Sequence, residues 1–223
     1  MNILPSMLAI RAIDTSYNGY WFRSRLEARW AVFLDSAKIE YKYEYQGYKS
    51  GKYRYLPDFR LPTFQGLEQY WEVKPKWPTE EEIEKAIMLC IGLQRPVCFL
   101  VGDVWMGQYE VIRYMPLNAT FLSGYGTEPL MDDDYIHWRG SDQAIVFRPL
   151  ASGKTFISDI ADLKRGFACA LTRFVQCKEC GEFRFYQGKC ARCGFWSFHL
   201  DSPALQSAFT AARSARFEHG ERG

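Results

Sequence analysis

Residues 53–74 read YRYLPDFRLPTFQGLEQYWEVK, and this stretch decides how we expect the chain to fold. Two strand-like runs, 53–61 and 69–74, are separated by a turn-rich segment that contains proline and glycine. Pro57 has no backbone N–H, so the first run should be an edge strand or be bulged at that point. The sequence therefore predicts two neighbouring strands, with an interruption in the first.

The second run places its two charged residues on one face. Alternate side chains of a strand point to opposite faces, which brings Glu72 and Lys74 together. Trp71 and Val73 share the other face, and we expect them to enter the core. A cross-strand ion pair on a solvated face is the simpler explanation of this charge pattern.

Asp58 follows the interruption at Pro57, where an opened ladder can re-aim a side chain. Viewed alone, it is at least as well explained as a turn aspartate. A short connection between the strands would bring Asp58 near Glu72, and adjacent carboxylates repel unless one is protonated or a cation bridges them. Mg²⁺ and Mn²⁺ take oxygen ligands of this type, and Lys74 beside them suits phosphodiester hydrolysis.

The flanking segments predict helices and further strands. Apolar residues recur at helical spacing from about Trp21 to Ala37, and Thr79 with three following glutamates marks a helix that should run to about Leu93. Further strands are expected at 39–48, 96–102, 110–114 (an edge strand) and 144–148, and further helices at 157–173 and 204–218. The order helix, three strands, helix, strand predicts an α+β or α/β fold with a mixed central sheet.

Glu27 lies in the first of these helices, at the margin of its apolar face. A carboxylate that points toward a core edge is costly unless a positive group meets it. The simpler explanation is a surface pair with Arg23 or another arginine, because most helical glutamates are solvated. Glu27 is a candidate site residue only in combination with Asp58 and Glu72.

Pro57-Asp58 followed by Glu72-Val73-Lys74 resembles the motif of the PD-(D/E)XK nuclease superfamily, and the segment around Glu27 is similar to that family's first helix. Over residues 18–102 the resemblance implies a restriction-endonuclease-like αβββαβ core. It implies that Asp58, Glu72 and the Val73 carbonyl bind Mg²⁺ or Mn²⁺, that Glu27 is an outer ligand or holds a metal-bound water, and that Lys74 is the catalytic lysine. The second helix lacks the Gln-x-x-x-Tyr pattern of many end-processing members, which favours an endonuclease.

Two CxxC pairs with nine residues between them form a second cluster of potential ligands. Four thiolates at this spacing are typical of a closed, structural zinc site, and a glycine follows each pair, where a tight turn needs one. The ligands would be Cys177, Cys180, Cys190 and Cys193. The segment resembles zinc ribbons, which often bind nucleic acid or protein. Its aromatic residues either stack on such a ligand or only cover the metal knuckle.

Basic residues near both clusters are candidates for contacts with DNA phosphates. They are Arg23, Arg25, Lys76, Arg184, Lys189 and Arg192. For the arginines of the first helix, a solvated helix face is an equal alternative. The formal net charge of +2 does not identify a nucleic-acid-binding protein, but a local basic surface can coexist with it.

Composition excludes a disordered chain, because 48% of the 223 residues are hydrophobic and 17% are aromatic. No run of about 18 apolar residues predicts a membrane span. Seven cysteines, four of them in CxxC pairs, favour a reducing cytoplasm over a disulfide framework. We therefore expect a cytoplasmic protein of a bacterial cell or a phage-infected host, with no membrane partner.

Three parts are predicted: a nuclease core at 18–115, an extension of uncertain structure at 116–173, and a zinc ribbon with a helix at 174–223. The predicted function is that of a Mg²⁺-dependent endonuclease that cleaves DNA. The alternative is a non-enzymatic adaptor that binds nucleic acid or a protein partner through the zinc ribbon. An RNA substrate and the oligomeric state are left open.

Overall fold

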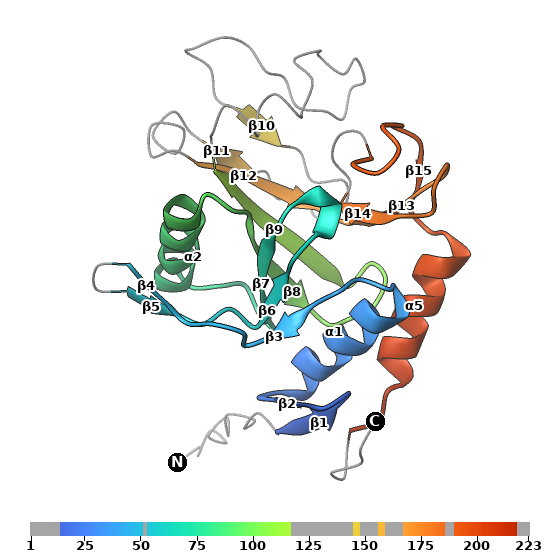
Figure 1. The fold of residues 1–223 in the computed structure, drawn as a ribbon, viewed down its shortest axis with the longest axis horizontal. Coiled ribbons are helices and arrows are strands. Elements are labelled where there is room, and N and C mark those ends of the chain that lie inside the picture. Colours follow the sequence, from blue (N-terminus) through green and yellow to red (C-terminus); the bar gives the residue numbers. More distant parts are fainter. Residues whose placement is uncertain are drawn as a thin grey trace, which may run out of the picture.

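The computed structural model describes residues 14–50, 53–116, 145–147, 156–158, 167–185 and 190–217. Within these ranges the protein is α+β, with a mixed central sheet and three α-helices (Figure 1). None of the helices in these ranges is long and apolar enough to cross a membrane.

The first half of the chain contains the candidate nuclease motif. Its elements are β1 (Thr15–Tyr17), β2 (Tyr20–Phe22), α1 (Arg25–Ser36), β3 (Lys42–Tyr43), β4 (Tyr48–Ser50), β5 (Tyr53–Tyr55), β6 (Phe59–Leu61), a 3₁₀ turn (Phe64–Gly66), β7 (Gln69–Lys74), α2 (Glu80–Leu93), β8 (Val97–Gly102) and β9 (Tyr109–Pro116). The second half has mostly short strands. Its elements are β10 (Ile145–Phe147), β11 (Phe156–Ser158), β12 (Phe167–Thr172), β13 (Phe174–Cys177), β14 (Phe183–Phe185), β15 (Phe198–His199) and α5 (Pro203–Ser214).

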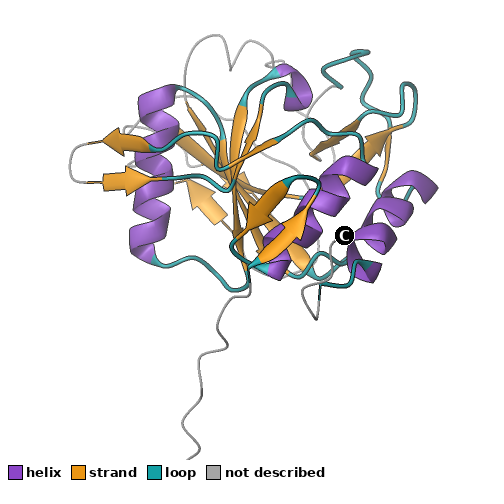
Figure 2. Ribbon diagram, turned by 60° about the horizontal axis from the view of Figure 1, so that its bottom comes forward, coloured by secondary structure: helices purple, strands orange, loops and turns teal. Residues whose placement is uncertain are grey.

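Helices cover both faces of the central sheet, whose strand order is β12-β9-β8-β7-β6-β3 (Figure 2). Strands β7 and β8 are parallel, and the other neighbours are antiparallel. Helices α1 and α5 pack side by side on one face, where Trp30 and Trp71 are buried. Helix α2 and the β4–β5 hairpin lie on the other face, over a second core that contains Phe99 and Ile112.

Helix α1 begins later than the apolar spacing predicts. Trp21 and Phe22 belong to β2, which forms a hairpin with β1. The helix starts after Ser24, whose side chain accepts the backbone N–H of Glu27 at 3.2 Å and so caps the first turn. The spacing Ser24-x-x-Glu27 is that of a capping box, a signal of the true helix start that apolar periodicity does not contain.

The strands expected at 39–48 and 53–61 are each divided between two sheets. Strand β4 pairs with β5 in a separate hairpin, whereas β3 pairs with β6 in the central sheet. The chain leaves the hairpin and enters the central sheet between β5 and β6, at Pro57. The predicted interruption at Pro57 is therefore confirmed, and it marks a change of sheet.

The later elements agree in part with the sequence predictions. Strand β7, helix α2 after Thr79, strand β8, strand β10 and helix α5 lie close to their predicted ranges. Strand β9, however, is not an edge strand, because β12 pairs beyond it. The helix expected at 157–173 is wrong where the chain is described, since β11 and β12 lie there. Pairing with the free edge of β9 overrides the helical preference of the alanine-rich segment 167–172.

The cysteine-bearing segment shares its core with the first helix. Phe174 and Phe185 are buried in the same cluster as Trp30 and Trp71, and Phe209 of α5 completes it. Phe174 and Phe209 stand 4.9 and 4.6 Å from the ring of Phe33 in α1, measured between ring centroids. The predicted boundaries at 115 and 173 stay predictions, but the described residues on either side of them are packed together.

Candidate metal centres: a carboxylate cluster and a cysteine cluster

Strands β6 and β7 bring Asp58 and Glu72 together. Phe59 pairs with Trp71, so the same register extended by one residue places Asp58 opposite Glu72. Residues directly opposite each other in an antiparallel pair share a face. The charge of Glu72 acts directly on the Asp58 carboxyl, and Glu82 of α2 reaches Lys74 beside Glu72.

Asp58 is buried in an excess of negative charge, with an exposed fraction of 3%. Its Oδ2 accepts the backbone N–H of Val73 at 2.7 Å, and its Oδ1 accepts the guanidinium of Arg23 at 2.9 Å. Burial, followed by the charges of Glu72 and Glu27, raises the pKa of Asp58 well above its ordinary value. The Val73 and Arg23 contacts oppose this rise without cancelling it, so the site favours a further positive group.

Glu72 and Lys74 form the second half of this cluster. The Lys74 ammonium lies 3.0 Å from Oε1 of Glu72 and 2.7 Å from Oε1 of Glu82 in α2. The other oxygen of Glu72, Oε2, is buried, and the buried hydroxyl of Tyr55 interacts with this carboxylate. Burial raises the pKa of Glu72 in spite of the charge of Lys74. Two buried carboxylates side by side are costly, and a hard cation with oxygen ligands can offset that cost.

The carbonyl of Val73 faces the same place. Tyr70 donates its N–H to the carbonyl of Pro96, on the β8 side. Successive residues of a strand direct their backbone groups to opposite sides, so Val73, three residues later, directs its N–H and C=O toward β6. The register extended by two residues sets Val73 opposite Pro57, which has no N–H to donate. The N–H of Val73 therefore donates to the Asp58 carboxylate instead of to a backbone carbonyl of the neighbouring strand. The carbonyl of Val73 receives no hydrogen bond from Pro57, because proline has no N–H.

Glu27 is held firmly at the start of α1. Its carboxylate accepts the Ser24 hydroxyl at 2.7 Å, the Tyr43 hydroxyl at 2.6 Å and the backbone N–H of Arg23 at 3.2 Å. The predicted surface alternative does not fit, because the Arg23 guanidinium contacts Asp58 and Glu44 and Glu27 is only 8% exposed. Glu27 therefore acts on the cluster through its charge and through the position of α1.

The carboxylates are suited to a cation only as a pair. In the described part of the chain, one group of three or more Cys, His, Asp or Glu residues is placed to hold a metal ion, and it consists of the four cysteines. Glu27, Asp58 and Glu72 do not form such a group together. The available oxygen donors are those of Asp58 and Glu72 with the Val73 carbonyl, and Oδ1 of Asp58 becomes available when Arg23 releases it.

Lys74 is a stable positive charge at this site. Burial lowers the pKa of its ammonium, but the charge of Glu72 and the hydrogen bonds to Glu82 and Glu72 outweigh burial, and the pKa is raised. A lysine in this state is suited to neutralising negative charge and not to removing a proton from water. Sequence reasoning missed the contact of Glu82 with Lys74, because the Thr79-x-x-Glu82 spacing indicates only the capping box that Glu82 completes.

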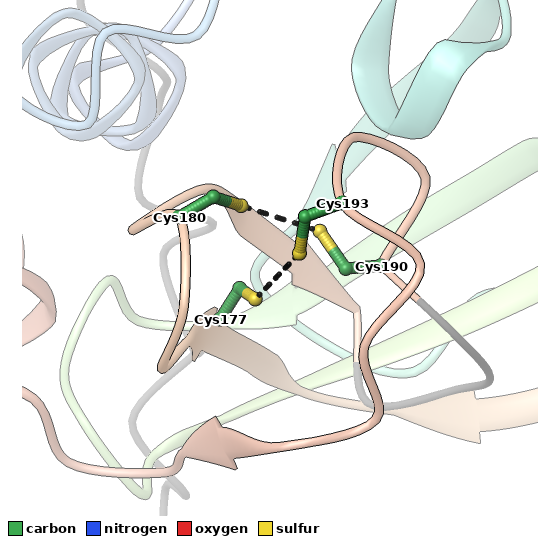
Figure 3. Close-up of side chains that lie close together, drawn as sticks. All are labelled: Cys177, Cys180, Cys190 and Cys193. Atoms are coloured by element: carbon green, nitrogen blue, oxygen red, sulfur yellow. Dashed lines mark hydrogen bonds between the residues drawn. The ribbon is translucent and has the colours of Figure 1, made fainter.

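The four cysteines converge in the second cluster (Figure 3). The sulfurs of Cys177 and Cys193 are 3.5 Å apart, as are those of Cys180 and Cys190, and all four sulfurs lie within 4.8 Å of one another. A tetrahedral zinc ion with Zn–S bonds of about 2.3 Å separates its sulfurs by about 3.8 Å. The cluster can therefore hold zinc.

Backbone groups support both cysteine knuckles in the same way. Gly181 and Gly194 have φ values of 72° and 77°, as the sequence predicts for a turn that follows each pair. Each donates its N–H to the first cysteine of its pair, at 3.1 and 2.8 Å. Burial raises the pKa of the Cys177 thiol, but hydrogen bonds from the backbone N–H groups of Cys180 and Glu179 outweigh burial and bring the pKa down to about 7. This favours a thiolate at Cys177.

The basic residues expected to contact DNA differ in exposure. Arg184 is 1% exposed, and its guanidinium donates to the carbonyl of Trp196 at 3.2 Å. That burial leaves no surface for a phosphate to reach, in conflict with the predicted contact. Lys76, Arg192 and the Arg23 side chain are exposed, Arg25 is partly buried, and Lys189 lies outside the described residues.

The aromatic residues of the cysteine segment also divide into two groups. Phe185 is fully buried in the α1 core, which fits a structural role. Phe195 and Trp196, which follow the second knuckle, are 57% and 39% exposed. Among the described residues of the segment, this pair offers the exposed aromatic surface.

Comparison of the chain with protein-family models, with curated proteins and with solved structures found no match. The resemblance to the PD-(D/E)XK superfamily therefore rests on the motif and on the element order. That order is α1, then β3, β6 and β7, then α2 and β8, with the β4–β5 hairpin between β3 and β6.

Proposed function

We propose that the protein is a metal-dependent nuclease of the PD-(D/E)XK type, an endonuclease that hydrolyses DNA phosphodiester bonds. The observation that carries the proposal is the burial of two neighbouring carboxylates, Asp58 and Glu72, beside the ammonium of Lys74. Burial and the charge of Glu72 raise the pKa of Asp58 well above its ordinary value, and a divalent cation between the two carboxylates would remove their repulsion.

Asp58, Glu72 and the Val73 carbonyl would hold Mg²⁺ or Mn²⁺. When bound, such an ion polarises a phosphoryl oxygen and lowers the pKa of a coordinated water. Lys74, held by Glu72 and Glu82, neutralises charge on the phosphoryl oxygens as phosphorus is attacked. Glu27 fixes the start of α1 and adds negative charge beside Asp58.

Arg23 contacts Asp58 in the metal-free site and could contact a DNA phosphate once a metal is bound. Its guanidinium neutralises Asp58 in the structure, yet its side chain is 55% exposed. If Asp58 held a cation, its Oδ1 would no longer need the Arg23 guanidinium, which could then turn toward solvent. There it can pair with a phosphate of the DNA, for which arginine has a suitable donor geometry.

The direct test is cleavage of plasmid and linear DNA with Mg²⁺, Mn²⁺ or EDTA. We expect metal-dependent cutting that is lost in Asp58→Ala, Glu72→Ala and Lys74→Ala. Glu40→Gln, at an exposed glutamate away from the site, is the matched control and should cut as the wild type does. Equal cutting by the control and the three site variants would refute the proposal. The same assay with RNA decides between the two substrates.

We also propose that the cysteine cluster holds a structural zinc ion. The equal sulfur separations and the four-thiolate ligand set support zinc over harder cations. The exposed Phe195 and Trp196 favour the second candidate function, an adaptor that binds nucleic acid or a protein beside this knuckle. As long as its zinc is retained, an adaptor binds DNA equally well with Mg²⁺ and in EDTA. It leaves the DNA intact in both conditions.

A further inference from the structure

The β4–β5 hairpin carries two basic residues in an unfavourable arrangement. It projects from the central sheet beside α2 (Figures 1 and 2). Lys49 on β4 lies directly opposite Arg54 on β5, and both side chains are exposed. Like charges directly opposite each other weaken an antiparallel pair. The arrangement lowers the stability of the hairpin and so calls for another explanation.

These two charges have no carboxylate beside them among the described residues. Within the described ranges, neither Lys49 nor Arg54 forms an ion pair, whereas Arg60 and Lys85 are paired with glutamates. An anion that lies across the hairpin would contact both side chains and remove their repulsion. A chain of phosphates provides such charges at regular spacing.

The opposite face of the hairpin is anchored in the protein. Tyr48 and Tyr55 pack against the core under α2, and the Tyr48 hydroxyl donates to the Tyr70 hydroxyl at 2.9 Å. The hairpin is therefore a fixed platform that presents Lys49 and Arg54 outward. A shallow hollow of about 490 Å³ lies on it, lined by Gly47, Tyr48, Lys49, Arg54, Tyr55 and Leu56.

The inner face of the platform lies next to the carboxylate cluster. The Tyr55 hydroxyl is buried near Glu72 and Asp58, whose charges, after burial itself, raise the pKa of this tyrosine. Arg54 precedes Asp58 by four residues, which an extended chain spans in at most about 13 Å. A DNA strand advances about 3.4 Å for each phosphate. Phosphates held at Arg54 are therefore only a few nucleotides from the carboxylates.

We propose that the β4–β5 hairpin binds the backbone of duplex DNA through Lys49 and Arg54 and places the duplex within a few nucleotides of the carboxylate cluster. The major groove of DNA is wide enough to admit a two-stranded ribbon. The binding role is carried by the hairpin alone; the statement that the bound DNA is cut there rests on the proposed nuclease function.

The binding test compares Lys49→Gln/Arg54→Gln with Lys38→Gln/Arg216→Gln. The control loses the same charge at two exposed residues near the far ends of α1 and α5. Fluorescence anisotropy of a labelled duplex is measured in EDTA over a series of salt concentrations. We expect the hairpin variant to bind about tenfold more weakly or worse, with a slope of log K against log salt that is lower by about 1.8, the value for two phosphates. The control should stay within about twofold of the wild type.

Two further measurements separate a loss of binding from a loss of folding. The hairpin variant should melt at the wild-type temperature or above it, because a repulsion has been removed. In the wild-type protein, bound duplex should protect Lys49 but not Lys38 from an amine-reactive reagent, as read by mass spectrometry. Unchanged affinity and salt slope together with an unprotected Lys49 would overturn the proposal.

The outcomes also separate this inference from the proposed function. If the wild type cuts DNA and the hairpin variant binds DNA normally, the nuclease proposal is supported and the hairpin proposal is refuted. If the wild type does not cut and the hairpin variant loses binding, the hairpin proposal is supported and the nuclease proposal is refuted. Absence of any DNA binding by the wild type overturns both.

Discussion

The two clusters of potential ligands differ in how they are assembled. The four cysteines come from one segment, 177–193, and local turns with matching hydrogen bonds place their sulfurs. The carboxylates of Glu27, Asp58 and Glu72 come from three separate elements, and Arg23, Lys74 or a hydrogen-bond donor already contacts each of them. A local site is complete in itself, whereas a site made by tertiary packing has to neutralise its own charge until a ligand arrives.

The largest expected effect is loss of the cysteine cluster. Cys177→Ser or Cys193→Ser should remove about one bound zinc per chain and several kcal/mol of folding free energy. This corresponds to a melting temperature lower by about 10 °C or more. Zinc analysis and calorimetry measure both quantities, with Cys90→Ala as a cysteine control outside the cluster. Unchanged zinc content in the variants would remove the metal assignment.

Loss of a carboxylate should affect cleavage far more than folding. Asp58→Asn and Glu72→Gln should lower the cleavage rate by about two to three orders of magnitude, or about 3–4 kcal/mol of barrier. Because the raised pKa values show that negative charge is unfavourable here, neither variant should melt below the wild type in EDTA. If both melt lower and still cut, these residues form a structural ion-pair network.

The pH dependence of the metal-free protein gives a third test. The pKa values of Asp58 and Glu72 are raised by folding, so the folded state binds more protons than the unfolded state above about pH 4. This contribution to stability is complete below the unfolded pKa and disappears as pH rises through the folded pKa. The melting temperature in EDTA should therefore fall toward neutral pH, less steeply in Asp58→Asn. Identical slopes would show that Asp58 does not carry this dependence.

Arg23→Gln should strengthen metal binding in the absence of DNA. The guanidinium competes with a cation for Oδ1 of Asp58, so its removal should raise Mn²⁺ affinity several-fold in calorimetric titration. Arg25→Gln is the neighbouring control. Weaker Mn²⁺ binding by Arg23→Gln than by this control would mean that Arg23 supports the site instead of competing for it.

The smallest expected effect is that of Glu82→Gln. The change weakens the capping box of α2, at about 0.5–1 kcal/mol, and one of the two contacts of Lys74. We expect a melting temperature lower by a few degrees and a cleavage rate lower by a few-fold. An unchanged rate would show that Glu72 alone positions the ammonium.

Sequence reasoning succeeds where a signal is local. Thr79 with its glutamates, the alternation in β7 and the CxxC spacing each depend on a few adjacent residues, and the corresponding elements are present. It fails where a distant partner decides. The alanine-rich segment 167–172 becomes a strand because β9 offers a free edge, and 39–48 divides because β4 pairs with β5. The contact of Arg23 with Asp58 spans 35 positions, and neither residue's neighbours in sequence indicate it.

The two contacts of Glu82, with Thr79 and with Lys74, limit which sequence changes the segment between them can accept. One of its oxygens caps α2 at Thr79 while the other holds Lys74, so residues 75–79 connect two points that are already tied together. Pro75 and Lys76 in this connection are exposed, whereas Trp77 packs against the core under α2 and Pro78 is buried. The length of the connection is constrained, because an inserted or deleted residue would pull either the helix or the ammonium out of place. We therefore expect tolerance of substitution at positions 75 and 76 and intolerance of insertion anywhere between Lys74 and Thr79.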